Sequence, residues 1–127
     1  MNAEANSELS KMPMFRRWVT AARLKTLGLS VTPVLVGTWL AAVGGNWRVD
    51  VLVTALVSAI SIQIGTNLWN DAADGVSGVD GVNRLGPPRV TSLGLLGAQE
   101  VRTAAAVVFL LAAVAGLYLV LVGGLPI

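Results

Sequence analysis

The chain of 127 residues contains no cysteine and no histidine, and only 13% of its residues are charged. Without cysteine there is no disulfide framework and no thiolate redox or zinc site, and without histidine there is no imidazole base or metal ligand. Any chemistry must therefore come from carboxylates, amides, hydroxyls, lysine and arginine. A formal net charge of +2 is too small to favour nucleic acid as the main partner.

Apolar residues dominate instead, at 54% of the chain. An average soluble domain has roughly 25% charged residues, so this chain has too few ionisable groups to cover a water-exposed surface. A bilayer core requires about 20 mostly apolar residues for each helix that crosses it. Residues 27–43, 51–69 and 103–125 meet this requirement, which predicts an all-α, polytopic membrane bundle with three transmembrane helices.

Lysine and arginine are distributed unevenly around these spans. The segment before the first span is rich in them, the loop between the first two contains only Arg48, and the loop after the second contains Arg84 and Arg89. Basic loops stay on the cytoplasmic side of a membrane. The pattern predicts an inner (plasma) membrane protein with a cytoplasmic N-terminus and a cytoplasmic loop at residues 70–100.

The two ends of the chain differ in character. Residues 1–12 are polar and are expected to form a disordered tail without a signal peptide, ahead of a membrane domain at residues 13–127. Apolar residues then recur at helical spacing over residues 15–22, which fits either a short helix on the membrane surface or a plain basic leader. The final Gly-Gly-Leu-Pro-Ile coincides with the end of the third span, so we expect the N-terminal part of a longer polypeptide.

Polar side chains recur at helical spacing where the second span ends. Gln63, Asn67, Asn70, Asp71 and Asp74 follow i, i+4, i+7, i+8 and i+11 spacing. A helix that continued through them would present all five on one face, which starts within the membrane and ends outside it.

Glycines come directly after this polar face. Gly75, Gly78 and Gly81 are expected to end the helix and loosen the chain. Asp80 lies within the same glycine-rich turn, close in sequence to the acidic end of the helix.

Asp71 and Asp74 form an unfavourable pair without a partner. They are like charges one turn apart where the helix macrodipole already disfavours negative charge, at about 0.3–1 kcal/mol per interaction. A bound divalent cation would reverse both effects, and Mg²⁺ takes carboxylate oxygens together with substrate phosphates. Arg84 and Arg89 follow, and guanidinium groups suit phosphate. The segment predicts a metal-bound diphosphate site, although a solvated loop at the membrane surface has a similar composition.

The order of these residues is similar to a known family pattern. Asn70-Asp71-x-x-Asp74 followed by Gly78-x-Asp80 resembles the first aspartate motif of the UbiA superfamily of membrane prenyltransferases. The continuation Arg-Leu-Gly-Pro-Pro-Arg-Val-Thr-Ser-x-Gly resembles one branch, the 1,4-dihydroxy-2-naphthoate polyprenyltransferases of menaquinone biosynthesis. So do Ala-Arg-x-Lys-Thr-Leu before the first span and Gln-Ile-Gly-Thr-Asn-Leu within the second. The likeness covers about residues 21–100.

This resemblance implies a fold and an activity. The family has about nine membrane helices and a second aspartate motif, whereas this chain has three spans and only the first motif, so the chain alone is expected to be inactive. The implied reaction is the Mg²⁺-dependent transfer of a polyprenyl group from its diphosphate to 1,4-dihydroxy-2-naphthoate, with loss of CO₂. The implied partners are polyprenyl diphosphate, an aromatic acceptor and the lipid bilayer.

The resemblance also assigns roles to residues. It makes Asp71 and Asp74 the catalytic metal-binding carboxylates. The implied metal ligands are Asn70, Asp71, Asp74 and Asp80. The implied diphosphate-binding residues are Arg84, Arg89, Asn67, Lys25 and Arg23. Lys25 and Arg23 fit equally well as positive-inside anchors of the first span.

Two other functions are compatible with the same residues. One is prenyl transfer to a different aromatic acceptor within the superfamily, against which the string from Arg84 to Gly94 argues. The other is a non-catalytic, three-span membrane protein that binds or assembles with partners. Only the enzyme requires Asp71 and Asp74 for function, so their substitution separates the two classes.

Overall fold

The computed structural model describes residues 10–77 and 89–124, which are helical with short connections and contain no strand. The elements are α2 (Met14–Ala22), the 3₁₀ turn η1 (Leu24–Thr26), α3 (Leu27–Val43), α4 (Val49–Ser77) and α5 (Ala98–Gly123). Three helical stretches are long and apolar enough to cross a membrane: Met14–Val43, Val49–Ser77 and Ala98–Gly123. The prediction of an all-α membrane bundle is confirmed.

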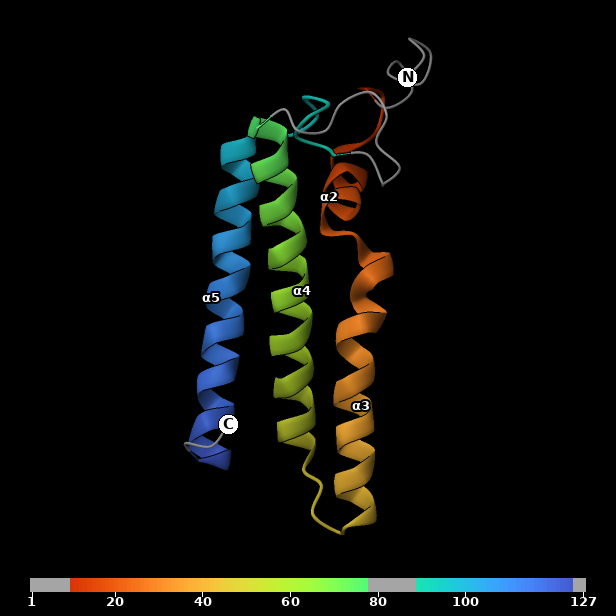
Figure 1. Cartoon of the computed structure of the whole chain (residues 1–127), viewed down its shortest axis with the longest axis vertical. Helices are drawn as coiled ribbons and strands as arrows, with labels where there is room; N and C mark the ends of the chain where they lie inside the picture. The colour runs from red at the N-terminus through yellow and green to blue at the C-terminus, as the bar shows by residue number, and fades with distance from the viewer. Residues whose placement is uncertain (1–9, 78–88, 125–127) are drawn as a thin grey trace.

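The three long helices run side by side, with α4 between α3 and α5 (Figure 1). The short helix α2 lies at the end of the bundle where α4 finishes and α5 begins. We call this the motif end, because Asp71 and Asp74 lie there in the last turns of α4. The connection from α3 to α4 lies at the opposite end (Figure 1).

Large apolar side chains cover the outside of the bundle. None of the residues of α3 is buried within the described part of the chain, and Leu29 is 76% exposed. The buried residues of α5 are mostly small and fall on one stripe: Val101, Ala105, Ala112 and Ala115. A helix that is apolar all round belongs in a membrane or inside a larger bundle. Together with its composition, this makes the chain part of a membrane protein.

The contact between α4 and α5 is close because a glycine faces an aromatic ring. A Cβ added to Gly65 would lie 2.8 Å from Cε1 of Phe109. Seven residues before Gly65 on α4, the Ser58 hydroxyl donates a hydrogen bond of 3.2 Å to the carbonyl of Ala112. Small residues at such positions allow two membrane helices to approach each other.

A sharp corner separates α2 from α3. Arg23 adopts a left-handed backbone conformation with φ of 52° at the end of α2, and its carbonyl accepts a hydrogen bond of 2.8 Å from the Thr26 amide. The helical spacing over residues 15–22 therefore corresponds to a separate short helix. The predicted tail at residues 1–12 lies mostly outside the described residues.

One expectation about the end of α4 is wrong. Gly75 does not stop the helix, which continues through it to Ser77. Thr91 instead lies against Gly75, so the glycine provides room for another segment of the chain. Gly78 and Gly81 lie outside the described residues.

Candidate functional site

The deeper part of the polar face binds the corner between α2 and α3. The side-chain amide of Asn67 donates two hydrogen bonds of 2.9 Å, to the carbonyl of Ala22 and to the hydroxyl of Thr26. Gln63 donates to the same hydroxyl at 3.3 Å. Asn67 is buried. Asn67, which the sequence predicted to bind diphosphate, therefore uses its side-chain N–H groups to hold α4 against the corner between α2 and α3.

Asp71 binds a turn that follows the loop. Its side chain is buried, with an exposed fraction of 1%. Oδ2 accepts a hydrogen bond of 3.0 Å from the Val90 amide, and Oδ1 accepts bonds of 3.0 Å from the Thr91 amide and 2.8 Å from the Thr91 hydroxyl. These three bonds use most of the accepting capacity of a carboxylate.

Asp74 lies nearer the surface and pairs with a loop arginine. Its carboxylate accepts a hydrogen bond from the Arg89 guanidinium, and this ion pair has a side-chain exposure of 35% for Asp74 and 8% for Arg89. Asn70, one turn earlier on α4, is exposed. The structure thus brings together Asp74 and Arg89, two residues that the sequence predicted to share a site.

The other predicted ligands are placed less fully. Lys25 is exposed in η1, and Arg23 is partly buried at the corner before it. Both belong to the corner that Asn67 of α4 binds through Ala22 and Thr26. Asp80 and Arg84 lie outside the described residues, so their predicted roles stay predictions.

Sequence reasoning missed a residue that joins α2 to the site. Nη1 of Arg17 donates a hydrogen bond of 3.0 Å to the carbonyl of Leu95. Its Nε and Nη2 donate to the carbonyls of Met12 and Ser10 at 2.9 and 3.0 Å. In the sequence Arg17 was one of several basic residues before the first span, and nothing in its spacing separates it from them.

The donor set at the motif end suits a hard divalent cation. Asp74 and Asn70 are i, i+4 neighbours on one helix, and both side chains reach the surface. Mg²⁺ usually binds through one or two carboxylates plus substrate phosphates. No group of three or more acidic residues gathers within residues 10–77 and 89–124, and Asp80 lies outside that part. Among the described residues, Asp74 and Asn70 are the ones whose oxygens could contribute to such a site.

An apolar groove starts beside this donor set. It lies between α4 and α5, has a volume of about 610 Å³, and is lined by Thr66, Trp69, Asn70, Ala106 and Phe109. Asn70, one turn before Asp74 on α4, is one of its lining residues, and Trp69 and Phe109 contribute aromatic rings.

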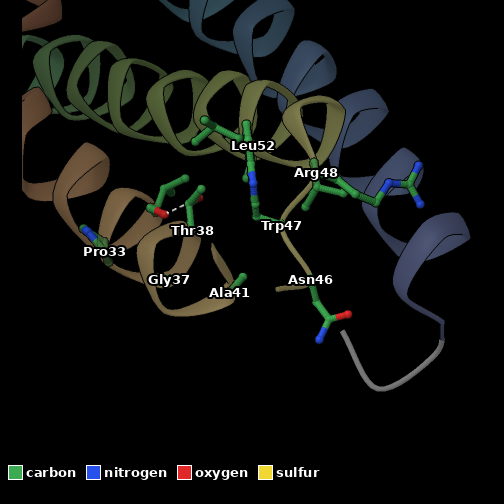
Figure 2. Close-up of a pocket in the computed structure, with 11 residues that line it drawn as sticks. Pro33, Gly37, Thr38, Ala41, Asn46, Trp47, Arg48 and Leu52 are labelled. Atoms are coloured by element: carbon green, nitrogen blue, oxygen red, sulfur yellow. Dashed lines mark hydrogen bonds between the residues drawn. The ribbon is translucent and has the colours of Figure 1, made fainter. Parts of the chain in front are cut away.

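A second cavity, of about 270 Å³, lies far from the motif. Figure 2 shows it between α3 and α4 near the connection of the two helices, with Pro33, Thr38, Trp47 and Leu52 around it. Its lining is mostly apolar and contains none of the predicted site residues. The cavity is therefore separate from the candidate site.

Several curated proteins are similar to this chain in sequence. The chain is 38% identical over 105 residues to the 1,4-dihydroxy-2-naphthoate octaprenyltransferase of Escherichia coli, and the alignment covers 83% of the chain and 34% of that protein. It is 40% identical over 114 residues to the protein of the same name from Mycobacterium tuberculosis, covering 87% of the chain and 37% of that protein. The corresponding protein of Mycobacterium leprae is 40% identical over 112 residues.

These alignments cover most of this chain but only part of each relative. The chain spans about a third of the length of the curated relatives it matches, while most of the chain is aligned. No protein-family profile matches the chain, and no solved structure matches it. Similarity over most of the chain to several proteins of one name places it plainly: the chain belongs to the 1,4-dihydroxy-2-naphthoate octaprenyltransferase family of membrane prenyltransferases, as a part of one member.

Proposed function

We propose that the full-length protein transfers a polyprenyl group from polyprenyl diphosphate to 1,4-dihydroxy-2-naphthoate, with loss of CO₂, in menaquinone biosynthesis. The observation that carries the proposal is the pairing of Asp74 with Arg89 beside an apolar groove in a membrane bundle. A carboxylate for the metal, a guanidinium for phosphate and an apolar channel are the three parts that a lipid diphosphate needs.

The diphosphate binds at the motif end. When bound there, Mg²⁺ supplies Lewis-acid stabilisation of the charge on the departing diphosphate. Asp74, Asn70 and Asp80 would hold the metal, while Arg89 and Arg84 would donate to the phosphate oxygens. The guanidinium of Arg89 is paired with Asp74 in the structure, so Asp74 would hold the metal next to the arginine that would bind the phosphate.

The polyprenyl chain leaves this site along apolar surface. The groove that starts at Asn70 offers Trp69 and Phe109 to the first isoprene units. An allylic cation formed there is surrounded by apolar groups, which keep water from intercepting it before the electron-rich ring of the acceptor does. The same apolar surroundings suit a lipid substrate that enters from the bilayer.

The membrane orientation follows from the basic residues. Arg17 lies in α2, and Arg23 and Lys25 lie at the corner that follows α2. On the positive-inside rule, these basic residues support a cytoplasmic position for this end of the bundle in an inner membrane. Lys25 and Arg23 add positive charge near the diphosphate. Prenyl transfer to another aromatic acceptor is the second candidate, because the described residues include none that is assigned to the acceptor.

The experiment uses membranes with the full-length protein, radiolabelled polyprenyl diphosphate and 1,4-dihydroxy-2-naphthoate. We expect activity to require Mg²⁺ and to fall by roughly 10²-fold or more in Asp74→Asn, because the variant would bind less well the metal that stabilises the departing diphosphate. Asp50→Asn, which makes the same change at the other end of α4, is the control and retains activity. Residues 1–127 alone are expected to be inactive.

Several outcomes would contradict the proposal. Full activity without Mg²⁺ or in Asp74→Asn would remove the metal and the carboxylate from the mechanism. Activity with hydroxybenzoate in place of 1,4-dihydroxy-2-naphthoate would favour the second candidate. Growth on menaquinone-dependent respiration that survives Asp74→Asn would favour a non-catalytic membrane protein.

A further inference from the structure

We propose that Asp71 is a positioning residue: it binds the turn that begins at Arg89 and so holds the Arg89 side chain in place for the diphosphate. We also propose that Gly75 is needed for the same contact, because it leaves room for that turn against α4. The proposal rests on the proposed function, in which Arg89 binds phosphate. It gives the two described carboxylates of the motif different roles: Asp74 binds the metal, and Asp71 binds another segment of the protein.

The turn in question comprises residues 89–95, and we call it the arginine turn. It is closed by backbone hydrogen bonds from Leu93 to Arg89, from Gly94 to Thr91 and from Leu95 to Val90, at 3.2, 3.0 and 3.0 Å. The turn therefore has a defined shape of its own. What it needs is an attachment that sets its position relative to α4.

Asp71 provides that attachment through three hydrogen bonds. Its two oxygens accept the amides of Val90 and Thr91 and the hydroxyl of Thr91. The Thr91 hydroxyl also lies within hydrogen-bond distance of the backbone carbonyl of Asp71. Bonds from consecutive amides fix the direction of the chain as well as its place. Hydrogen bonds to an ionised carboxylate are also stronger than bonds between neutral groups.

This attachment sets the place of Arg89 because Arg89 directly precedes the two amides. Val90 is buried, with 1% exposure, so its backbone has little freedom once Asp71 has bound it. The Arg89 side chain leaves the same turn and reaches Asp74. Without Asp71, the flexible guanidinium would have to find the phosphate from a turn of uncertain position.

Gly75 lies one turn after Asp71, on the same face of α4. A Cβ at Gly75 would overlap the Thr91 hydroxyl oxygen and lie 2.7 Å from the Thr91 Cβ and 3.1 Å from the Ser92 amide. Any other residue would push the arginine turn away from α4 and lengthen the bonds to Asp71. The contact between Asp71 and the arginine turn therefore requires a residue without a side chain at position 75.

The accessibility of the two carboxylates supports the division of roles. Asp71 is 1% exposed and accepts three hydrogen bonds from the protein, whereas the side chain of Asp74 is 35% exposed. A metal that binds together with a substrate needs open coordination positions. Asp74 and Asn70 offer such oxygens, and Asp71 offers them only if the arginine turn detaches.

The test uses the full-length protein in nanodiscs and compares Asp71→Asn, Thr91→Val and Gly75→Ala. Hydrogen exchange of the Val90 and Thr91 amides reports the attachment directly and does not depend on activity. We expect exchange of these amides to accelerate by about tenfold or more in Asp71→Asn, because a hydrogen bond to a charged group is lost. Thr91→Val and Gly75→Ala should accelerate it in the same direction, by less.

Kinetics provide the second readout. All three variants should raise the KM for polyprenyl diphosphate more than they lower kcat, and the Mg²⁺ concentration for half-maximal activity should stay unchanged. Asp74→Asn should do the reverse, raising the Mg²⁺ requirement while leaving the exchange of both amides as it was. Thr103→Val and Gly37→Ala are matched controls; Thr103 bonds only within α5 among the described contacts.

Two results would overturn the proposal. One is a raised Mg²⁺ requirement in Asp71→Asn with unchanged amide exchange, which would make Asp71 a metal ligand. The other is unchanged exchange in all three variants. If the full-length protein transfers no prenyl group, the proposed function fails, but the exchange result still decides the attachment. If Asp71→Asn does not fold, the milder Thr91→Val decides by the same measurements.

Discussion

Helix α4 carries carboxylates at both of its ends, and their surroundings differ. At the motif end, Asp71 is 1% exposed and binds two backbone amides that lie 19 and 20 residues further along the chain. At the opposite end, the side chain of Asp50 is 38% exposed and pairs with Arg48, two residues away, at 2.6 Å. Asp50 also accepts a hydrogen bond from Tyr118 of α5, so both carboxylates contact a distant segment, one while buried and the other while exposed.

Solvent explains much of this difference. An exposed ion pair exchanges water for a partner with little net gain, and its contribution to stability is about 0–1 kcal/mol. Asp50 raises the pKa of the Arg48 guanidinium above its ordinary value, chiefly through their side-chain hydrogen bond, so Arg48 stays charged at all physiological pH values. A buried carboxylate that satisfies backbone amides cannot be removed so easily, because the amides are left without a partner.

The largest effect expected from the difference between the two ends of α4 is that of Asp71→Ala. We expect the substitution to lower the free energy of unfolding by about 3 kcal/mol, because it removes a charged acceptor and leaves two amides unsatisfied. The measurement is reversible unfolding of the full-length protein in detergent micelles, followed by circular dichroism. A loss no larger than that of a surface substitution would show that the arginine turn does not depend on Asp71 for its stability.

A second test concerns apolar packing in the middle of α4. Gly65→Ala should cost about 2 kcal/mol, because the added methyl group overpacks the contact with Phe109. Gly37→Ala is the matched control, since a Cβ at Gly37 would meet no described atom within 4 Å. Thermal unfolding of the two variants should differ clearly, and equal midpoints would mean that the Phe109 ring moves aside without loss.

These contacts also mark how far the sequence could predict the structure. The three spans followed from composition, because a run of apolar residues without charge has few stable places outside a bilayer. The shared helical face of Asn67, Asp71 and Asp74 followed from helical periodicity. Both predictions depend only on residues near one another in the chain.

The partners of that face could not be predicted, because they depend on contacts between distant segments. Gly75 was expected to end α4, since a glycine in a helix is usually unfavourable. Its actual use depends on Thr91, sixteen positions later. In the same way, Arg17 was one basic residue among several until the structure placed it 3.0 Å from the Leu95 carbonyl, 78 positions away.

A smaller effect is expected at Asn67, where the partners are neutral. Asn67→Ala removes the hydrogen bonds to Ala22 and Thr26 and should lower stability by about 1 kcal/mol, in line with polar contacts between membrane helices. The exposed Asn46, which bonds to the Gly44 carbonyl at 3.0 Å, gives a matched control in Asn46→Ala. Equal stability of the two variants would show that the α2–α3 corner holds without Asn67.

The smallest effect is expected at the exposed end of α4. Asp50→Asn removes the charge that pairs with Arg48 and weakens the bond of 2.5 Å that the Tyr118 hydroxyl donates to Asp50. We expect no measurable change in the unfolding midpoint, because water can replace both partners and salt already screens the pair. Tyr118→Phe should behave in the same way, since it removes the hydroxyl and keeps the ring. Both variants should be measured at low and high salt in the same micelles. A loss of stability comparable to that of Asp71→Ala, or one that disappears at high salt, would mean that the contacts of Asp50 hold α5 against α4. Burial would then not explain why the carboxylates at the two ends of α4 differ in their effect on stability.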